Sequence, residues 1–252
     1  MKRNVISLIT VLGLFYIEAE PIKSNLGARH LFNEKESVIT ENPYITDGLF
    51  CMWDGEWNVG LGKHNSSTRV WTDIVNGLRL DIQFGSFTKD GLFGTASQAL
   101  NVISLDDFSD LKSVLTATGC TVEVVCTPLS FDAHGYSFYD IFMVYSVGNS
   151  HTHIFDWFRC HSNVFSLTSF GTIEEPISFT AITYQSSPYP RDEMYINGFF
   201  KSRGFYTPQN PSSTFAIVIK GGIHCIRIYD RTLSAEEIAY NYEIDKVRLN
   251  IP

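Results

Sequence analysis

The sequence predicts an all-β protein: a two-sheet antiparallel jelly-roll sandwich with a short C-terminal helix and an N-terminal arm. Short runs in which apolar and polar residues alternate recur along the chain, beginning at residues 78–85, with only one short helix or turn expected between them, at residues 106–115. The chain then closes with a strand-like run and a single helix. The other strand-like runs are residues 101–105, 119–127, 138–147, 151–158, 163–170, 177–184, 193–200 and 213–220.

The closing run has a clear pattern. Alternation places Ile223, Cys225, Arg227 and Tyr229 on one face of a strand, and His224, Ile226 and Ile228 on the other. Ser234 followed three residues later by Glu237 is a capping box, which predicts that a helix begins here.

Four stretches resemble the laminin-G-like domains of the concanavalin-A-like lectin/glucanase superfamily. They are the closing phrase at residues 222–245, the Trp- and Gly-rich stretch 47–73, the strand 120–126 and the hairpin Met-Tyr-Ile-Asn-Gly at 194–198. Together they cover roughly residues 45–248 in the family's order. The resemblance implies a β-sandwich at residues 46–252, preceded by an arm or leader with a tether at residues 1–45. It does not imply one activity, because the superfamily includes enzymes, lectins and structural modules.

Composition limits the classes of partner. The chain has 252 residues, 44% of them hydrophobic and 14% aromatic, which suits one globular core. It carries 19 basic and 27 acidic residues, a net charge of −8, and no basic stripe. We therefore expect no nucleic-acid partner and no acidic membrane surface.

The five cysteines are expected to be small core residues for the most part. Cys120 and Cys126 are six residues apart on one predicted strand, about 20 Å at the strand rise. A disulfide needs Cα atoms within about 7 Å, so these two cannot bridge each other. The others are Cys51, Cys160 and Cys225.

The N-terminus combines a basic start with an apolar run at residues 5–17. This run is shorter than the roughly 20 residues that span a bilayer, so no membrane span is predicted. It is either a secretory leader, with Ala19 at the cleavage edge, or a retained arm that docks on the sandwich or on another subunit. A retained arm on a single module of this kind resembles tailed-phage virion proteins. That resemblance implies contacts with other virion subunits through residues 1–40, and a possible homo-oligomer.

No catalytic motif is found, and the chain is predicted not to be an enzyme. The superfamily's retaining glucanases carry Glu-x-Asp-x-Glu on one strand. Here Glu243-Ile-Asp245 lacks a third acid and falls in the closing helix, and Asp54-Gly-Glu56 also lacks one. A glycoside hydrolase is the alternative with the weakest support in the sequence.

The sequence offers two candidate metal sites. His151 and His153, with Asp156 or His161, could bind zinc, but their aromatic neighbours favour ordinary packing or a polar surface. The family resemblance implies a possible Ca²⁺ at a loop rim, with candidate ligands Asp47, Asp54, Asp73 and Asp230. The alternative is that these aspartates make turns or begin a strand.

Sugar binding normally needs an aromatic platform beside hydrogen-bonding groups. Two loop regions offer these groups as exposed candidates: Trp57, His64 and Asn65 in the first, Tyr184, Tyr189 and Arg191 in the second. The alternative for Trp57 is that it covers the end of the sandwich, whereas Trp53 and Trp71 are expected in the core.

These observations predict a non-catalytic recognition or adhesion module on a virion or cell exterior. It would bind a glycan or a protein surface through loops around residues 54–70 and 185–192. The alternative is a phage capsid or tail decoration protein that uses its N-terminal arm as the interface.

Overall fold

The computed structural model describes residues 41–83, 85–94, 99–104, 109–115, 119–128, 175–184, 191–205, 214–218 and 221–252. These residues form an all-β fold that closes with one helix, as the sequence predicts. The elements are β1 (Leu49–Asp54), β2 (Val70–Thr72), β3 (Arg79–Asp81), β4 (Ser86–Thr88), β5 (Gly91–Phe93), β6 (Ala99–Ser104), α2 (Ser109–Leu115), β7 (Gly119–Pro128), β8 (Ile177–Tyr184), β9 (Arg191–Ile196), β10 (Phe199–Phe205), β11 (Thr214–Val218), β12 (Gly221–Tyr229) and α3 (Ala235–Leu249). The N-terminal arm and the predicted strands between residues 138 and 170 lie outside this set.

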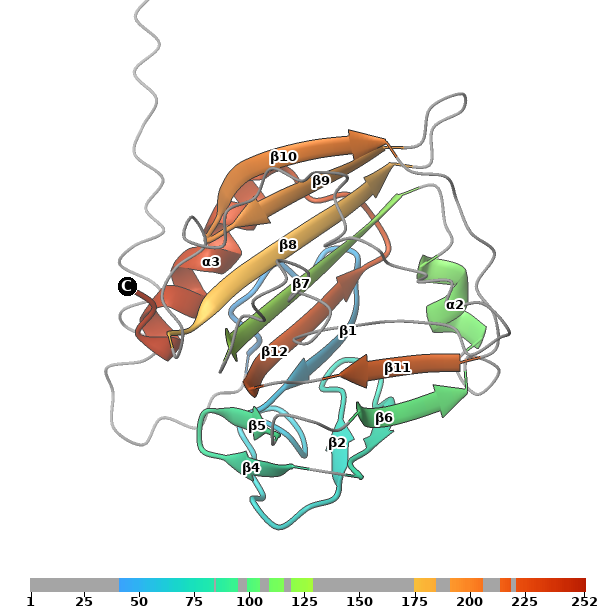
Figure 1. The fold of residues 1–252 in the computed structure, drawn as a ribbon, viewed down its shortest axis with the longest axis vertical. Coiled ribbons are helices and arrows are strands. Elements are labelled where there is room, and N and C mark those ends of the chain that lie inside the picture. Colours follow the sequence, from blue (N-terminus) through green and yellow to red (C-terminus); the bar gives the residue numbers. More distant parts are fainter. Residues whose placement is uncertain are drawn as a thin grey trace, which may run out of the picture.

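One large antiparallel sheet organises the fold (Figure 1). Its strand order is β10-β9-β8-β7-β12-β5-β4, and β1 also pairs with β12. The closing strand β12 is therefore central: β7 lies along one side of it, while β1 and β5 share the other side. Two smaller antiparallel pairs, β6 with β11 and β2 with β3, complete the described strands.

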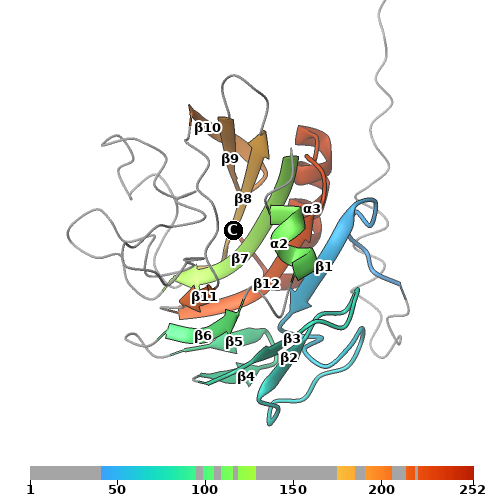
Figure 2. The same ribbon diagram turned by 90° about the vertical axis from the view of Figure 1, so that its right-hand side faces the viewer.

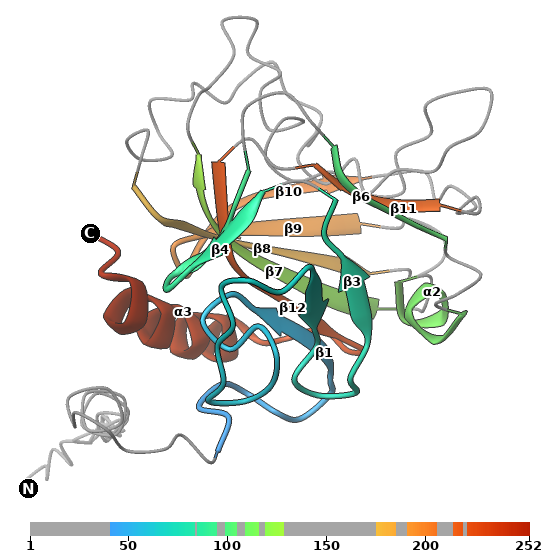
Figure 3. The ribbon, with the colours of Figure 1, turned by 90° about the horizontal axis from the view of Figure 1, so that it is seen from below.

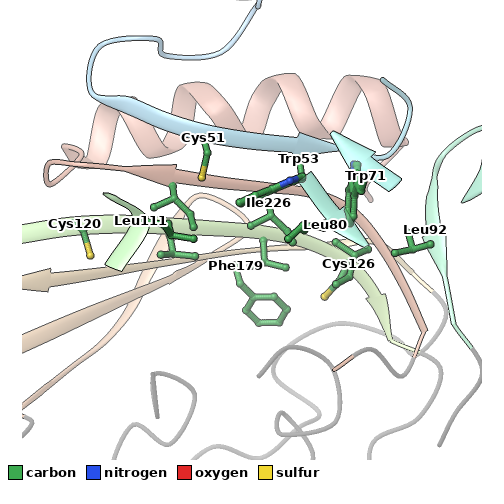
Figure 4. Close-up of a cluster of buried hydrophobic side chains, with 14 of the residues drawn as sticks. Cys51, Trp53, Trp71, Leu80, Leu92, Leu111, Cys120, Cys126, Phe179 and Ile226 are labelled. Carbon is green, nitrogen blue, oxygen red and sulfur yellow. The ribbon is translucent and has the colours of Figure 1, made fainter. Parts of the chain in front are cut away.

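Both faces of the large sheet are covered. Helix α3 lies against one face, and β6 with β11 lies on the opposite side (Figures 2 and 3). The core on the α3 side includes Val125, Ile182 and Ile238. The core on the other side includes Trp71, Leu80 and Ile226, and Figure 4 shows it on the side of the strands away from α3. Every residue of β12 is buried, because this strand has a hydrophobic layer on each side.

Helix α3 begins where the capping box predicts. The Ser234 hydroxyl accepts the Glu237 N–H, and the Glu237 carboxylate accepts the Ser234 N–H. The helix ends at Leu249, and the left-handed conformation of the following Asn250 turns the chain so that the Ile251 N–H also donates to the Lys246 carbonyl, at 3.2 Å. Within the described residues, no helix is long and apolar enough to cross a bilayer.

The cysteines that the structure describes are core residues, as predicted: Cys51, Cys120, Cys126 and Cys225 are all buried. Burial raises the pKa of Cys126 to about 12, so this thiol is protonated at neutral pH. Cys160 lies outside the described residues.

The predicted alternation of β12 is wrong at Ile223. The pairing register with β7 shifts between Ile223 and Cys225. This bulge turns Ile223 into the core that holds Ile226 and Ile228, whereas Cys225 and Tyr229 lie on the α3 side as expected.

His224 lies at this bulge and is buried. Its Nδ1 is 2.5 Å from the Asp90 carbonyl oxygen and its Nε2 is 2.7 Å from the Thr127 hydroxyl. Because a carbonyl only accepts, Nδ1 carries the proton, and the neutral Nε2 accepts from Thr127. Burial lowers the pKa of His224 below its ordinary value of 6.5.

This shift predicts a pH dependence of stability. In the unfolded chain the His224 ring takes up its second proton below about pH 6.5. In the folded chain the ring stays neutral until a lower pH. The free energy of unfolding should therefore decrease as pH falls through this window, by at most about 1.4 kcal/mol per pH unit. Urea titrations at pH 7.5 and 5.5 should show a larger loss for the natural chain than for His224→Gln. Equal losses would contradict the assignment.

Two glycines let three backbone segments meet beside this bulge. A Cβ on Gly55 would lie 2.4 Å from the Gly91 Cα, and one on Gly91 would lie 2.5 Å from the Ile223 carbonyl oxygen. The Gly55 N–H donates to the His224 carbonyl at 2.7 Å. The Asp54-Gly55 pair thus joins β1 to the centre of the sheet in addition to turning the chain.

We expect Gly55→Ala to destabilise the protein by about 1–3 kcal/mol, because the new methyl group meets backbone that cannot rotate away. Gly77→Ala is the control: its φ is +75° but nothing lies within 4 Å of the added Cβ. It should cost only the left-handed backbone penalty of about 1–2 kcal/mol. Urea unfolding of both variants gives the comparison, and Gly77→Ala costing more than Gly55→Ala would refute it.

Candidate functional site

Most buried charges that the structure describes gather between the large sheet and α3. At the centre is Arg227 of β12, which is fully buried. Its Nε donates to Glu123 of β7 at 2.7 Å, and its Nη1 and Nη2 donate to the two oxygens of Asp245 of α3 at 2.8 and 2.5 Å. The paired guanidinium thus bridges two strands and the helix.

Further hydrogen bonds complete the surroundings of Glu123. The side-chain amide of Asn241, on α3, donates to Glu123 at 2.8 Å and to the Tyr229 hydroxyl at 2.9 Å. The Thr180 hydroxyl donates to the other Glu123 oxygen at 3.2 Å. Burial raises the pKa of Glu123, and the adjacent Arg227 opposes that rise.

A second buried arginine, Arg248 at the end of α3, extends the network. It donates to both oxygens of Asp54 at 2.8 and 3.0 Å and to Glu56 at 2.7 Å. The Tyr44 hydroxyl joins the two centres, since it accepts from Arg248 at 2.6 Å and donates to Asp245 at 2.8 Å. Burial acts to lower the pKa of Arg248, but Asp54, Tyr44 and Glu56 together outweigh it, and the pKa lies well above its ordinary value.

The network is arranged to dock α3. Glu123, Asp245 and Asp54 are buried, and each accepts from an arginine of this chain. Hydrolysis of a glycoside needs two carboxyl groups that flank the sugar bond, one of them able to donate a proton. These three carboxylates are instead buried and hydrogen-bonded to arginine side chains of the same chain.

We expect Asp245→Asn to destabilise the fold by about 3–5 kcal/mol, because it leaves Arg227 buried with only part of its counter-charge. Glu237→Gln is the matched control. It weakens the half-exposed Arg231–Glu237 pair but keeps the capping box, and it should cost less than about 1 kcal/mol. Urea unfolding measures both, and equal costs would mean that the buried network does not hold α3.

The second feature is the Asn58 loop, residues 55–69, which starts directly beyond this network. Asp54 accepts the N–H groups of Glu56 and Trp57, both at 3.0 Å, and so fixes the start of the loop. Asn58 is fully buried, and its side chain forms two bonds with the backbone of Asn65: it accepts the N–H at 2.8 Å and donates to the carbonyl at 2.9 Å. The loop is therefore fixed across its middle.

The outer part of the Asn58 loop is polar and exposed. His64 contacts the Glu56 carbonyl at 3.0 Å, and the Arg69 guanidinium donates to the Gly85 carbonyl at 2.8 Å. Amide, hydroxyl and cationic groups thus stand on a fixed backbone, an arrangement that can hydrogen-bond the polar rim of a sugar. The exposed residues are Gly62, Lys63, His64, Asn65, Ser66, Ser67 and Arg69.

The predicted ligand residues differ in their exposure to solvent. His64 and Asn65 are exposed on this loop, but the expectation that Trp57 is exposed is wrong, since 3% of its surface is accessible. The Arg248 guanidinium lies 4.1 Å from the centre of the Trp57 ring. Tyr184 and Arg191 are backbone partners in the register of β8 and β9. Tyr189 lies outside the described residues, so the second loop stays a prediction.

The four aspartates proposed for calcium have separate surroundings. Asp47 pairs with Arg231, Asp54 pairs with Arg248, and Asp73 accepts the N–H groups of three residues at 2.6, 2.8 and 2.9 Å. Asp230 is exposed. In the described part of the chain, no group of three or more His, Cys, Asp or Glu side chains is placed to hold a metal ion. His151, His153, Asp156 and His161 lie outside it.

Two features were missed in the sequence. One is the buried network, for which Arg227 in the middle of an apolar strand was the available signal, since a buried charge needs a partner. The other is a pair of exposed aromatic residues, Phe199 and Phe200, with 68% and 51% of their surfaces accessible. Their exposure depends on β10 being a sheet edge, which no local pattern shows.

Comparison with known proteins places the fold. No family model matches the chain, and no curated protein matches it. Among solved structures, Trypanosoma rangeli sialidase in complex with sialic acid matches with a TM-score of 0.57 and 12% identity, over 88% of this chain and 37% of that one. A second structure of Trypanosoma rangeli sialidase matches with a TM-score of 0.53 and 11% identity, over 90% of this chain and 38% of that one. The binding domain of botulinum neurotoxin DC in complex with SialylT gives 0.50 and 11%, over 79% and 51%.

What is shared is a β-sandwich fold. At 11–12% identity the likeness extends no further than the fold, and this chain spans about half or less of the length of each of these structures. The laminin-G-like resemblance and the link to phage virions stay predictions.

Proposed function

We propose that this chain is a non-catalytic recognition module that binds a glycan through the outer part of the Asn58 loop. The observation that carries the proposal is the fixation of this loop by the buried Asn58 side chain. A loop whose backbone is already ordered loses little conformational entropy when it binds, so weak hydrogen bonds to a sugar suffice.

The charge of the loop suggests the class of glycan. The fully charged side chains exposed between residues 62 and 69 are Lys63 and Arg69, both cationic. They favour sugars that carry carboxylate or sulfate groups. Supporting this direction, the structures that share the fold include a sialidase in complex with sialic acid and a toxin binding domain in complex with SialylT.

The non-catalytic part of the proposal rests on the carboxylates. The sequence lacks the strand motif of the superfamily's glucanases, and the buried acids described above are paired with arginine. A place on a virion or cell exterior, and a laminin-G-like relationship, belong to the same proposal. The alternative of a decoration protein depends on residues 1–40, which lie outside the described residues.

A glycan array with neutral, sialylated and sulfated sugars tests the binding. We expect an acidic glycan to bind, and the double variant Lys63→Ala/His64→Ala to bind it at least about tenfold more weakly, because exposed contacts are lost. Lys89→Ala is the control, since Lys89 is equally cationic and 89% exposed on the turn between β4 and β5, outside the Asn58 loop. It should leave both binding and melting temperature unchanged.

Two results would overturn the proposal in different ways. Binding that is unaffected by the double variant would remove the Asn58 loop as the site. Release of free sugar from the bound glycan, followed by NMR with purified protein, would show that the module is an enzyme.

A further inference from the structure

Strand β10 is the last strand of the large sheet. Within the described part of the chain it pairs only with β9, so its other side offers backbone N–H and C=O groups. Figure 1 shows it at the end of the sheet opposite β4 and β5. Such an edge can accept an additional strand.

Two phenylalanines at the start of β10 are the most exposed large hydrophobic residues described, at 68% for Phe199 and 51% for Phe200. They follow a tight turn in which Asn197 and Gly198 have φ of 51° and 77°. Asn197 bonds both ways with Ser178: its N–H donates at 2.8 Å and its side chain accepts at 3.0 Å. The turn is therefore fixed, and the exposure of the two rings is a feature of the folded state.

The helix α3 supports the same turn. A Cβ on Gly198 would lie 2.9 Å from the ring of Tyr242, so glycine lets the hairpin pack directly on α3. The Lys246 ammonium group lies over the same Tyr242 ring, 5.9 Å from its centre. The beginning of β10 is thus held by the sheet and by the helix.

The two rings lie on opposite faces of the edge. Phe199 is opposite Ile196, which belongs to the core away from α3. Phe200 is opposite Tyr195, which belongs to the α3-side core, and their rings meet edge-on at 5.6 Å. A partner that covers both rings has to run along the edge between them. An extended strand does so, because its side chains alternate between the two faces.

The charges on β10 define the chemistry of this partner. Lys201 is exposed, and the register shift between Phe200 and Ser202 leaves it as the extra residue of a bulge. Arg203 is also exposed, but its guanidinium already pairs with the buried Glu193 of β9 at 2.5 Å. Lysines and bulges at an edge discourage pairing between copies of one protein, since a second copy brings the same charges. An acidic strand is attracted by the same charge. The exposed phenylalanines also point to a partner, because protecting the edge against pairing needs charges and does not need apolar surface.

We propose that the edge of β10 binds an extended segment of a partner protein, acidic where it meets Lys201 and apolar at the end that meets Phe199 and Phe200. The Asn58 loop is a separate surface, and this inference does not depend on glycan binding.

Two synthetic peptides test the proposal: acetyl-Val-Glu-Val-Glu-Leu-Leu-amide and its counterpart with lysine in place of glutamate. Run antiparallel to β10, the first brings its leucines to the phenylalanines and its glutamates to Lys201 and Arg203. We expect it to bind about threefold more tightly than the lysine peptide at low salt, because the charge pair with the exposed Lys201 changes sign. Hydrogen exchange should slow at the β10 amides that do not face β9.

Variants locate the site. Phe199→Ser/Phe200→Ser should abolish binding and keep the fold, because both side chains are exposed. Lys201→Glu should weaken binding of the glutamate peptide about threefold and strengthen binding of the lysine peptide. Lys89→Glu, an equal change of charge on a distant turn, should change neither. If Lys201→Glu weakens binding of the glutamate peptide and strengthens binding of the lysine peptide, a general loss of stability is not the cause, because it would weaken both.

Other occupants give distinct results, and each would overturn the proposal. Outward β10 amides that are already protected without peptide show that the edge is covered. If deletion of residues 1–40 removes that protection, the occupant is this chain's own arm; if light scattering shows a dimer that the double serine variant lacks, it is a second copy. Binding to phosphatidylserine vesicles through the phenylalanines, with neither peptide bound, would assign a lipid surface.

Discussion

The rest of the structure depends on the buried guanidinium of Arg227. A charge removed from water is costly unless its partners are placed to compensate it. Here Glu123 comes from β7, Asp245 from α3 and the arginine itself from the central strand. Only one register of β7 on β12, and only one position of α3 over them, brings these groups together. The interaction therefore selects one arrangement of strands and helix.

The same network connects the scaffold to its rim. Tyr44 links Asp245 to Arg248, and Arg248 holds Asp54, which in turn fixes the first residues of the Asn58 loop. A loop attached in this way has a rigid base, even though its outer residues face solvent. The geometry is that of a surface presented by a scaffold, with the charges beneath it used for support.

Helix α3 has a second role at the other end of the sheet. Its Tyr242 packs on Gly198 and steadies the turn that presents Phe199 and Phe200. One short helix thus holds both surfaces for which a partner is proposed. Its own position follows from a local signal, the capping box at Ser234 and Glu237, together with a long-range one, the ion pair to Arg227.

The sequence by itself determined the all-β class, the closing helix and several strands, among them β7, β8 and β12, because alternation and capping are local patterns that a few neighbouring residues encode. It also determined that most cysteines are core residues. The predicted strand 193–200 is wrong in its bounds, since it spans the turn between β9 and β10. Only the tertiary structure decided that Ile223 changes face at a bulge, that Trp57 lies beneath Arg248, and that Phe199 and Phe200 stand at a sheet edge. Each of these depends on which distant segment lies alongside, since exposure and strand order are properties of the assembled sheet.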